Sequence, residues 1–250
     1  MQRVQNILNG KIEEFEKESL FEFMRDTRVP AQKRLAFVPS LAHFVMSFAD
    51  LYALVLRREP AEDEHQELVN AHTYEDGGHW KWFLADLGNL GCDPVVKYSD
   101  AIRFIWGSST VHMRRLTYGL CQLCHESDSL RRLVLVQCIE AAGKVSLASS
   151  AVVAQEIAAA TKKSLVYFGP HHFETESDHT LEEERVHAEL ARIQLDDARV
   201  EEFTAVIEQS FELFTEFIQE LRETCRRDVN GPRVRPGLEA QVEDAAAGLS

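Results

Sequence analysis

The segment 196–227, DDARVEEFTAVIEQSFELFTEFIQELRETCRR, repeats apolar residues at spacings of three and four. A helix that turns about 100° per residue places residues at these spacings on one face. Such a face packs either against the core of its own chain or against a dimer partner, and we expect the core. The stripe contains Phe203, Ile207, Phe211, Phe214, Ile218 and Leu221.

The same periodicity extends along most of the chain, and segments of alternating polarity are almost absent. Prolines at positions 30, 39, 60, 94 and 170 fall between the periodic segments, where proline is tolerated. Asp128 or Ser127 is suited to cap the helix that follows it. The sequence therefore predicts an all-α fold, with helices at about residues 2–26, 39–58, 61–90, 98–106, 109–126, 128–161, 171–190 and 196–227.

No internal linker divides the periodic segments, so we expect one helical domain over residues 1–227. The polar segment that follows, 228–250, is rich in Gly, Pro and Ala and is expected to form a flexible C-terminal tail.

The composition restricts the class of partner. The formal net charge is −14 and there is no basic stripe, which argues against nucleic acid. The stretch from Leu41 to Leu56 contains His43 and Asp50, so no membrane span is expected there. The first residues lack a basic segment followed by an apolar run, and five scattered cysteines suit reduced thiols. A cytoplasmic protein is expected.

The segment 167–179, YFGPHHFETESDH, carries a possible metal-binding pattern. His172, Glu176 and His179 stand at positions i, i+4 and i+7, which share one face of a helix. Imidazole nitrogens and a carboxylate oxygen that point the same way suit a divalent transition metal. A surface helix rich in Glu and His can also produce this spacing without binding a metal.

A second cluster lies in the predicted helix 61–90, where His72, Glu75, Asp76 and His79 occupy positions i, i+3, i+4 and i+7. Either Glu75 or Asp76 could join His79 at one ion, with the carboxylate as a bridge. The Gly-Gly pair at 77–78 weakens a helix by about 1 kcal/mol per residue relative to alanine, which suits a local distortion at a site. A simple helix break with solvated polar residues is the alternative.

Glu140 lies in the largely apolar segment 134–145, VLVQCIEAAGKV. A carboxylate on a buried helix needs a cation, a proton or an ion pair, and Lys144 is the local candidate for the pair. We favour a metal. Together with the two clusters, Glu140 brings the potential ligands to about six, enough for two irons with positions left open for dioxygen.

These residues resemble the haem-oxygenase-like superfamily, which includes the TenA proteins, pyrroloquinoline-quinone synthase and iron-containing redox enzymes. The resemblance is to the last branch and covers about residues 35–225. There, a Tyr-Phe pair precedes a His-acid-His helix, here 167–168 followed by His172, Glu176 and His179, and a middle-helix Glu corresponds to Glu140. The chain departs from the pattern in having Glu176 where Asp is commoner. The gap between the first metal-binding acid and the histidine after it is also shorter than in several members. Glu75 and Asp76 therefore compete for the position of that acid.

The resemblance implies a haem-oxygenase-like multi-helix bundle that holds two non-haem iron ions. Members of that branch use iron and dioxygen to oxidise amino acids, fatty acids or their own side chains. The expected function is therefore an oxygen-dependent oxidoreductase with a small organic substrate, and a homodimer is a candidate assembly. The expected metal ligands are Glu75, Asp76, His79, Glu140, His172, Glu176 and His179.

Other functions remain open from the sequence. A ferritin-like di-iron bundle could pair Asp76 with His79 and Glu176 with His179. A metal-free helical module of the same fold could bind a ligand or another protein. Haem is disfavoured because residues 1–26 contain no histidine for the proximal position of a haem oxygenase. A TenA-type hydrolase would need a cysteine nucleophile, for which Cys138 is the only candidate.

Overall fold

A computed structural model describes residues 1–178, 190 and 192–230, with the side chains of 175–178 and 228–230 outside this description. No strand occurs among the described residues, so the predicted all-α fold is confirmed for them. The α-helices, 3-10 helices and one π-helix are α1 (Gln2–Phe15), α2 (Ser19–Arg25), α3 (Ala31–Arg34), η1 (Val38–Leu41), α4 (Ala42–Asp50), η2 (Leu51–Leu56), α5 (Glu64–Asp76), α6 (Trp80–Leu90), α7 (Tyr98–Ile105), η3 (Ser108–Thr110), α8 (Val111–Cys124), α9 (Ser129–Thr161), α10 (Pro170–Asp178) and α12 (Asp197–Asn230).

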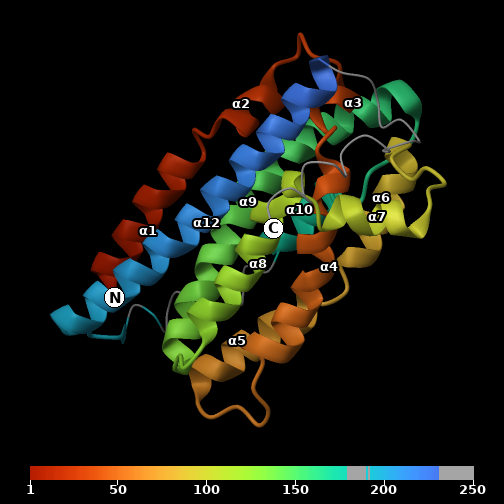
Figure 1. Ribbon diagram of the computed structural model, residues 1–250. Helices are drawn as coiled ribbons and strands as arrows, with labels where there is room; N and C mark the ends of the chain where they lie inside the picture. Colours follow the sequence, from red (N-terminus) through yellow and green to blue (C-terminus); the bar gives the residue numbers. More distant parts are fainter. Residues whose placement is uncertain (179–189, 191, 231–250) are drawn as a thin grey trace, which may run out of the picture.

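Helix α9 is the central element of the bundle. It contacts α12 and α1 on one side and α5 and α10 on others (Figure 1). Its first turns are buried in an unbroken run from Arg132 to Val136, as expected of a helix surrounded by others. Asp128 caps it by accepting a hydrogen bond from the backbone N–H of Arg131 at 2.8 Å, which confirms one of the two predicted caps.

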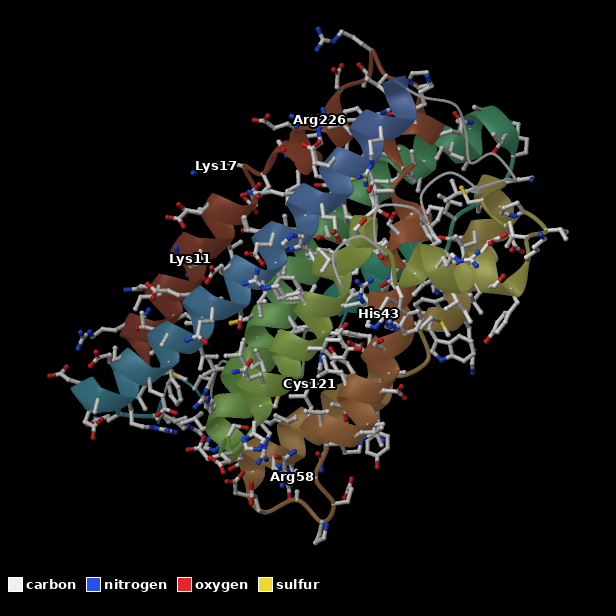
Figure 2. All side chains as sticks on the ribbon, in the orientation of Figure 1. Lys11, Lys17, His43, Arg58, Cys121 and Arg226 are labelled. Atoms are coloured by element: carbon white, nitrogen blue, oxygen red, sulfur yellow. The ribbon has the colours of Figure 1, made fainter. Side chains whose placement is uncertain are left out.

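The apolar stripe of α12 faces the core of its own chain. All six of its residues are buried, and Phe211 and Phe214 pack edge-on against Phe15 of α1. Charged side chains of the N-terminal segment and of α12 lie on the outer edge of the bundle, as Lys11, Lys17 and Arg226 show (Figure 2).

Several predicted helices are interrupted. The segment 2–26 forms α1 and α2, and 39–58 forms η1, α4 and the π-helix η2. The predicted helix 61–90 is wrong in its middle, because α5 ends at Asp76 and α6 begins at Trp80. The weak helix propensity of two consecutive glycines explains this break. The last helix reaches Asn230, and most of the expected tail lies outside the described residues.

Two described helical stretches, Ala31–Leu56 and Ser129–Thr161, pass a test of length and composition for a membrane span. The second is α9, and a helix buried at the centre of a bundle passes the same test. The test therefore gives only weak support for a membrane span.

Candidate metal centre

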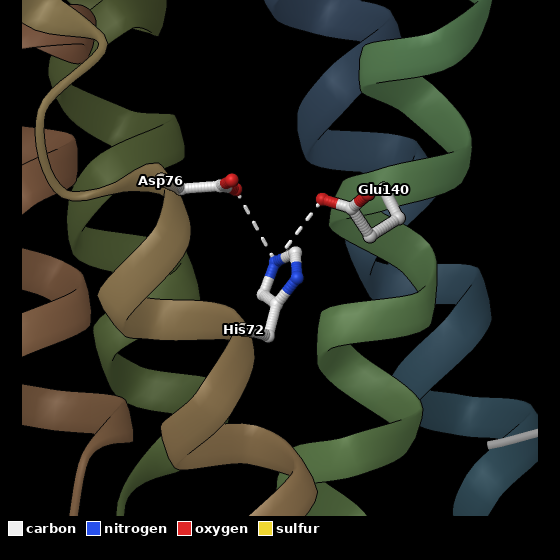
Figure 3. A group of neighbouring side chains, drawn as sticks. All are labelled: His72, Asp76 and Glu140. Atoms are coloured by element: carbon white, nitrogen blue, oxygen red, sulfur yellow. Dashed lines mark ion pairs between the residues drawn. The ribbon is translucent and has the colours of Figure 1, made fainter. Parts of the chain in front are cut away.

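Helix α5 delivers two polar side chains to the interior at its C-terminal end. His72 and Asp76 are four residues apart, so they share one face of the helix. Their closest atoms, His72 Nε2 and Asp76 Oδ2, are 3.3 Å apart, and the Asp76 side chain is only 5% exposed (Figure 3). The helix ends at Asp76, where Gly77 follows.

Glu140 approaches the same imidazole from the central helix α9. Its Oε1 lies 3.1 Å from His72 Nε2, and Figure 3 shows the histidine between the two acids. One ligand atom from each of His72, Asp76 and Glu140 lies within 4.8 Å of the others, so these three residues could hold a metal ion. His72 was part of the predicted stripe but was not predicted as a ligand. Its i, i+4 spacing from Asp76 was the signal that could have identified it.

A second pair of imidazoles lies beside this group. His172 Nε2 on α10 is 3.1 Å from Nδ1 of His79, the residue immediately before α6. Asp76 presents Oδ1 to His79 at 3.9 Å and Oδ2 to His72. This carboxylate therefore lies between a group formed with His72 and Glu140 and a group formed with His79 and His172. Trp82 stacks on the His79 ring, with centroids 4.3 Å apart.

The segment that leads into α10 fixes the orientation of His172. Because a carbonyl oxygen only accepts hydrogen bonds, His172 Nδ1–H donates to the Tyr167 carbonyl at 2.8 Å, and Nε2 is left to face His79. Asp86 on α6 holds the same segment by accepting from the N–H groups of Val166 at 2.7 Å and Phe168 at 3.0 Å. Burial raises the pKa of Asp86, while these backbone bonds and the nearby His172 oppose the rise.

Tyr52 is a further site residue that the sequence did not indicate. Its hydroxyl donates to Asp76 Oδ2 at 3.2 Å and lies 3.0 Å from His72 Nε2, and the residue is fully buried. Tyr52 belongs to the π-helix η2, whose wider turn alters the direction of its side chains. Single π turns within helices are frequent at functional sites.

Burial differs within two pairs of neighbouring residues between which the sequence left a choice. Glu75 is exposed whereas Asp76 is buried, and Asp76 is the acid that lies with His72 and Glu140. His171 is exposed whereas His172 is buried, which agrees with the register chosen for that pair. The side chain of Glu176 and all of His179 lie outside the described residues, so their predicted roles remain predictions.

An apolar cavity of about 140 Å³ opens beside the cluster. Asp76, His79, Glu140 and His172 form its polar end. Most of the remaining wall is apolar, with phenyl rings from α2, α4 and α12 that include Phe21, Phe44, Phe48, Phe214 and Phe217.

Comparison with solved structures identifies the architecture. A TenA homolog from Pseudomonas syringae pv. tomato DC3000 matches with a TM-score of 0.62 and 16% identity, over 89% of this chain and 92% of that one. A domain of unknown function from Shewanella denitrificans OS217, described as having a heme oxygenase-like fold, matches with a TM-score of 0.64 and 16% identity, over 94% and 96%. This chain has the haem-oxygenase-like fold. No family model and no curated protein matches the sequence.

Within the haem-oxygenase-like fold, two alternative roles lose support. A ferritin-like site would leave His172 idle at the surface, but this residue is only 5% exposed and contacts His79. The candidate nucleophile of a TenA-type hydrolase, Cys138, is fully buried, and burial raises its pKa to about 12. A thiol with so high a pKa is protonated at neutral pH and is a poor nucleophile.

The donor set of this haem-oxygenase-like chain fits a transition metal. Atoms bound to one ion at about 2.1 Å are about 3.0–3.4 Å apart when they subtend 90–109°. The contacts of His72 with Glu140 and Asp76, at 3.1 and 3.3 Å, and that of His172 with His79, at 3.1 Å, fall in this range. Hydrogen bonds have similar lengths, so the distances alone do not identify a metal site, and the chemical type of the ligand atoms carries the argument. Mixed imidazole and carboxylate ligands suit iron and similar metals, whereas calcium and magnesium prefer oxygen alone.

Proposed function

We propose that this chain is a non-haem di-iron, oxygen-dependent oxidoreductase that acts on a small organic molecule. The observation that carries the proposal is the meeting of His72, Asp76 and Glu140 beside the His79–His172 pair, at the end of an apolar cavity. These residues come from three separate parts of the chain, at 72–79, 140 and 172. Nothing in the packing of a helical bundle requires five ionisable side chains to gather at one largely buried place, because burying them costs free energy unless they are paired.

The proposed ligands divide into two sets. His72 and Glu140 would hold one ion, and His79 and His172 would hold the other. Asp76 would bridge the two, because each of its oxygens faces one set. The predicted ligands Glu176 and His179 would complete the second set. Two ferrous ions in these positions would supply electrons and open coordination positions for dioxygen.

The surrounding residues would prepare the site before any substrate enters. The Tyr167 carbonyl fixes the tautomer of His172 by accepting from its Nδ1–H. The hydroxyl of Tyr52 holds the Asp76 carboxylate and offers a proton at a fully buried position. The phenyl rings give the same space a largely apolar lining, which would disfavour water there.

Metal content and oxygen consumption test the proposal. Protein loaded with ferrous iron under nitrogen and then desalted should retain two irons per chain, and should consume oxygen when air is admitted. A folded protein that retains no iron would contradict the proposal and would favour a metal-free ligand-binding module of the same fold.

Substitution at neighbouring histidines makes the test specific. His172→Ala should lower the iron content to about one per chain, whereas His171→Ala should leave it unchanged because that side chain is exposed. Asp76→Asn should lower it further than His172→Ala, because the carboxylate faces both sets of ligands. Far-UV circular dichroism checks that each variant keeps its helices. Equal losses at His171 and His172 would refute the ligand assignment.

A further inference from the structure

His79 lies in a turn that does little by itself to fix the orientation of its ring. Among the described residues that we propose as ligands, it is the only one outside a helix. It follows Gly77 and Gly78, and glycine leaves the backbone more conformational freedom than other residues do. A Cβ atom at Gly78 would meet no heavy atom within 4 Å beyond its chain neighbours, so the rest of the protein does not pack against the turn there. The imidazole of His79 must therefore be oriented by contacts from outside the turn.

Trp82 makes such a contact. It stands three residues after His79, in the first turn of α6, and this spacing brings two side chains together. The indole lies almost parallel to the imidazole, with ring centroids 4.3 Å apart and an interplanar angle of 16°. It also meets the His172 ring edge-on, with centroids 5.3 Å apart and an interplanar angle of 75°. One indole thus contacts both described histidines of the second ligand set.

The stack fixes the plane of the His79 ring. An imidazole nitrogen binds a metal ion through a lone pair that lies in the plane of the ring, so the orientation of the ring sets the direction in which an ion can bind. His79 Nδ1 lies 3.1 Å from His172 Nε2 and 3.9 Å from Asp76 Oδ1. A tilt of the imidazole would turn Nδ1 away from both atoms. Stacking disfavours that tilt, because the contact between the two ring faces would be lost.

We propose that Trp82 is a positioning residue that holds the plane of the His79 imidazole and so directs Nδ1 to the second metal ion. The proposal rests on the proposed function, because it assigns Nδ1 to one of the two irons. Trp82 itself supplies no ligand atom, since an indole N–H is only a donor, and it acts through His79. Residues that orient metal ligands change metal affinity by about 10- to 100-fold. Loss of the indole should therefore weaken the binding of the second ion about tenfold.

Competition with a chelator, using ferrous iron under nitrogen, measures the affinities for the two ions. Trp82→Leu should weaken the second ion about tenfold and leave the first unchanged, because His72 and Glu140 hold the first. Trp82→Phe keeps a flat ring and should retain most of the affinity. Trp80→Leu is the matched control, because this tryptophan is also half-buried, and both affinities should be unchanged in it. No loss in Trp82→Leu, an equal loss in Trp80→Leu, or an equal loss in Trp82→Phe would overturn the proposal.

Proton NMR of the metal-free protein tests the stack itself. An indole over the face of an imidazole shifts the signals of that imidazole upfield, and His79→Gln identifies these signals by removing them. They should lie upfield of the signals of the exposed His125, and should return to ordinary positions in Trp82→Leu. Far-UV circular dichroism checks that each variant keeps its helices. His79 signals at ordinary positions in the unsubstituted protein would overturn the proposal, and this result needs no tryptophan variant.

The iron content of each sample separates this inference from the proposed function. A chain that retains no iron would refute the oxidoreductase and, with it, any role of Trp82 in metal binding. A chain that retains two irons, with the same affinities in Trp82→Leu as in the unsubstituted protein, would refute the positioning role alone.

Discussion

Replacing Asp86 tests whether its carboxylate holds the segment that orients His172. Asp86→Ala removes the acceptor of two buried N–H bonds, from Val166 and Phe168. A buried donor left without a partner costs about 1–3 kcal/mol, which gives about 2–6 kcal/mol for two. Part of this loss of free energy is offset, because burying the Asp86 carboxylate itself costs free energy. We therefore expect the free energy of unfolding to fall by about 2–4 kcal/mol.

Urea unfolding followed by circular dichroism measures this change at pH 7. In a chain of this length the melting temperature should fall by roughly 2–4 °C for each kcal/mol. Asp86→Asn keeps one acceptor and should lose about half as much stability as Asp86→Ala, which gives a second measurement if the alanine variant does not fold. The exposed Asp93→Ala is the control, with a change within about 0.5 kcal/mol. If Asp86→Ala were as stable as the control, the role of Asp86 in holding the segment that leads into α10 would be refuted.

Three other residues give independent predictions. Tyr52→Phe removes the hydroxyl that holds Asp76, so iron affinity measured by competition with a chelator should fall about tenfold, and an unchanged affinity would count against this role. Burial and a nearby guanidinium lower the pKa of His43 below 6.5, so the folded protein binds this proton less tightly than the unfolded chain does. Stability should therefore decline as the pH falls from 6.5 through the folded-state pKa, and urea titrations of His43→Asn should show a smaller decline. Because burial raises the pKa of Cys138 to about 12, mass spectrometry should find no alkylation by iodoacetamide there before unfolding.

Local patterns in the sequence were sufficient to predict the fold class and some of the residues that meet in the interior. Helical periodicity depends on which residues lie three and four apart, and this spacing is present in the sequence itself. The stripe that contains Phe203 and Phe211 was accordingly assigned to the core, and both residues are buried. Glu140 was predicted to have a partner because it is a carboxylate among apolar neighbours. His72 Nε2 lies 3.1 Å from its Oε1.

The tertiary structure decided which neighbours in the sequence are buried beside the cluster. Glu75 and Asp76 are chemically similar and adjacent, and only the packing of α5 against α9 shows which of the two is buried. The prediction that His79 shares a stripe with Asp76 assumed an unbroken helix, and the helix in fact ends at Asp76. His79 nevertheless comes close to Asp76 and to His172 on α10, because the turn between α5 and α6 redirects it.

The supporting residues were beyond the reach of sequence patterns for a related reason. Asp86 and Val166 are 80 positions apart, and Tyr52 and Asp76 are 24 apart. No short-range spacing connects such pairs, because their contacts arise only when whole helices pack together. The sequence by itself determined the helical class of the fold and the kinds of ligand atom available. Packing determined which of those atoms face one another, since the direction of each side chain depends on where its helix begins, ends and turns.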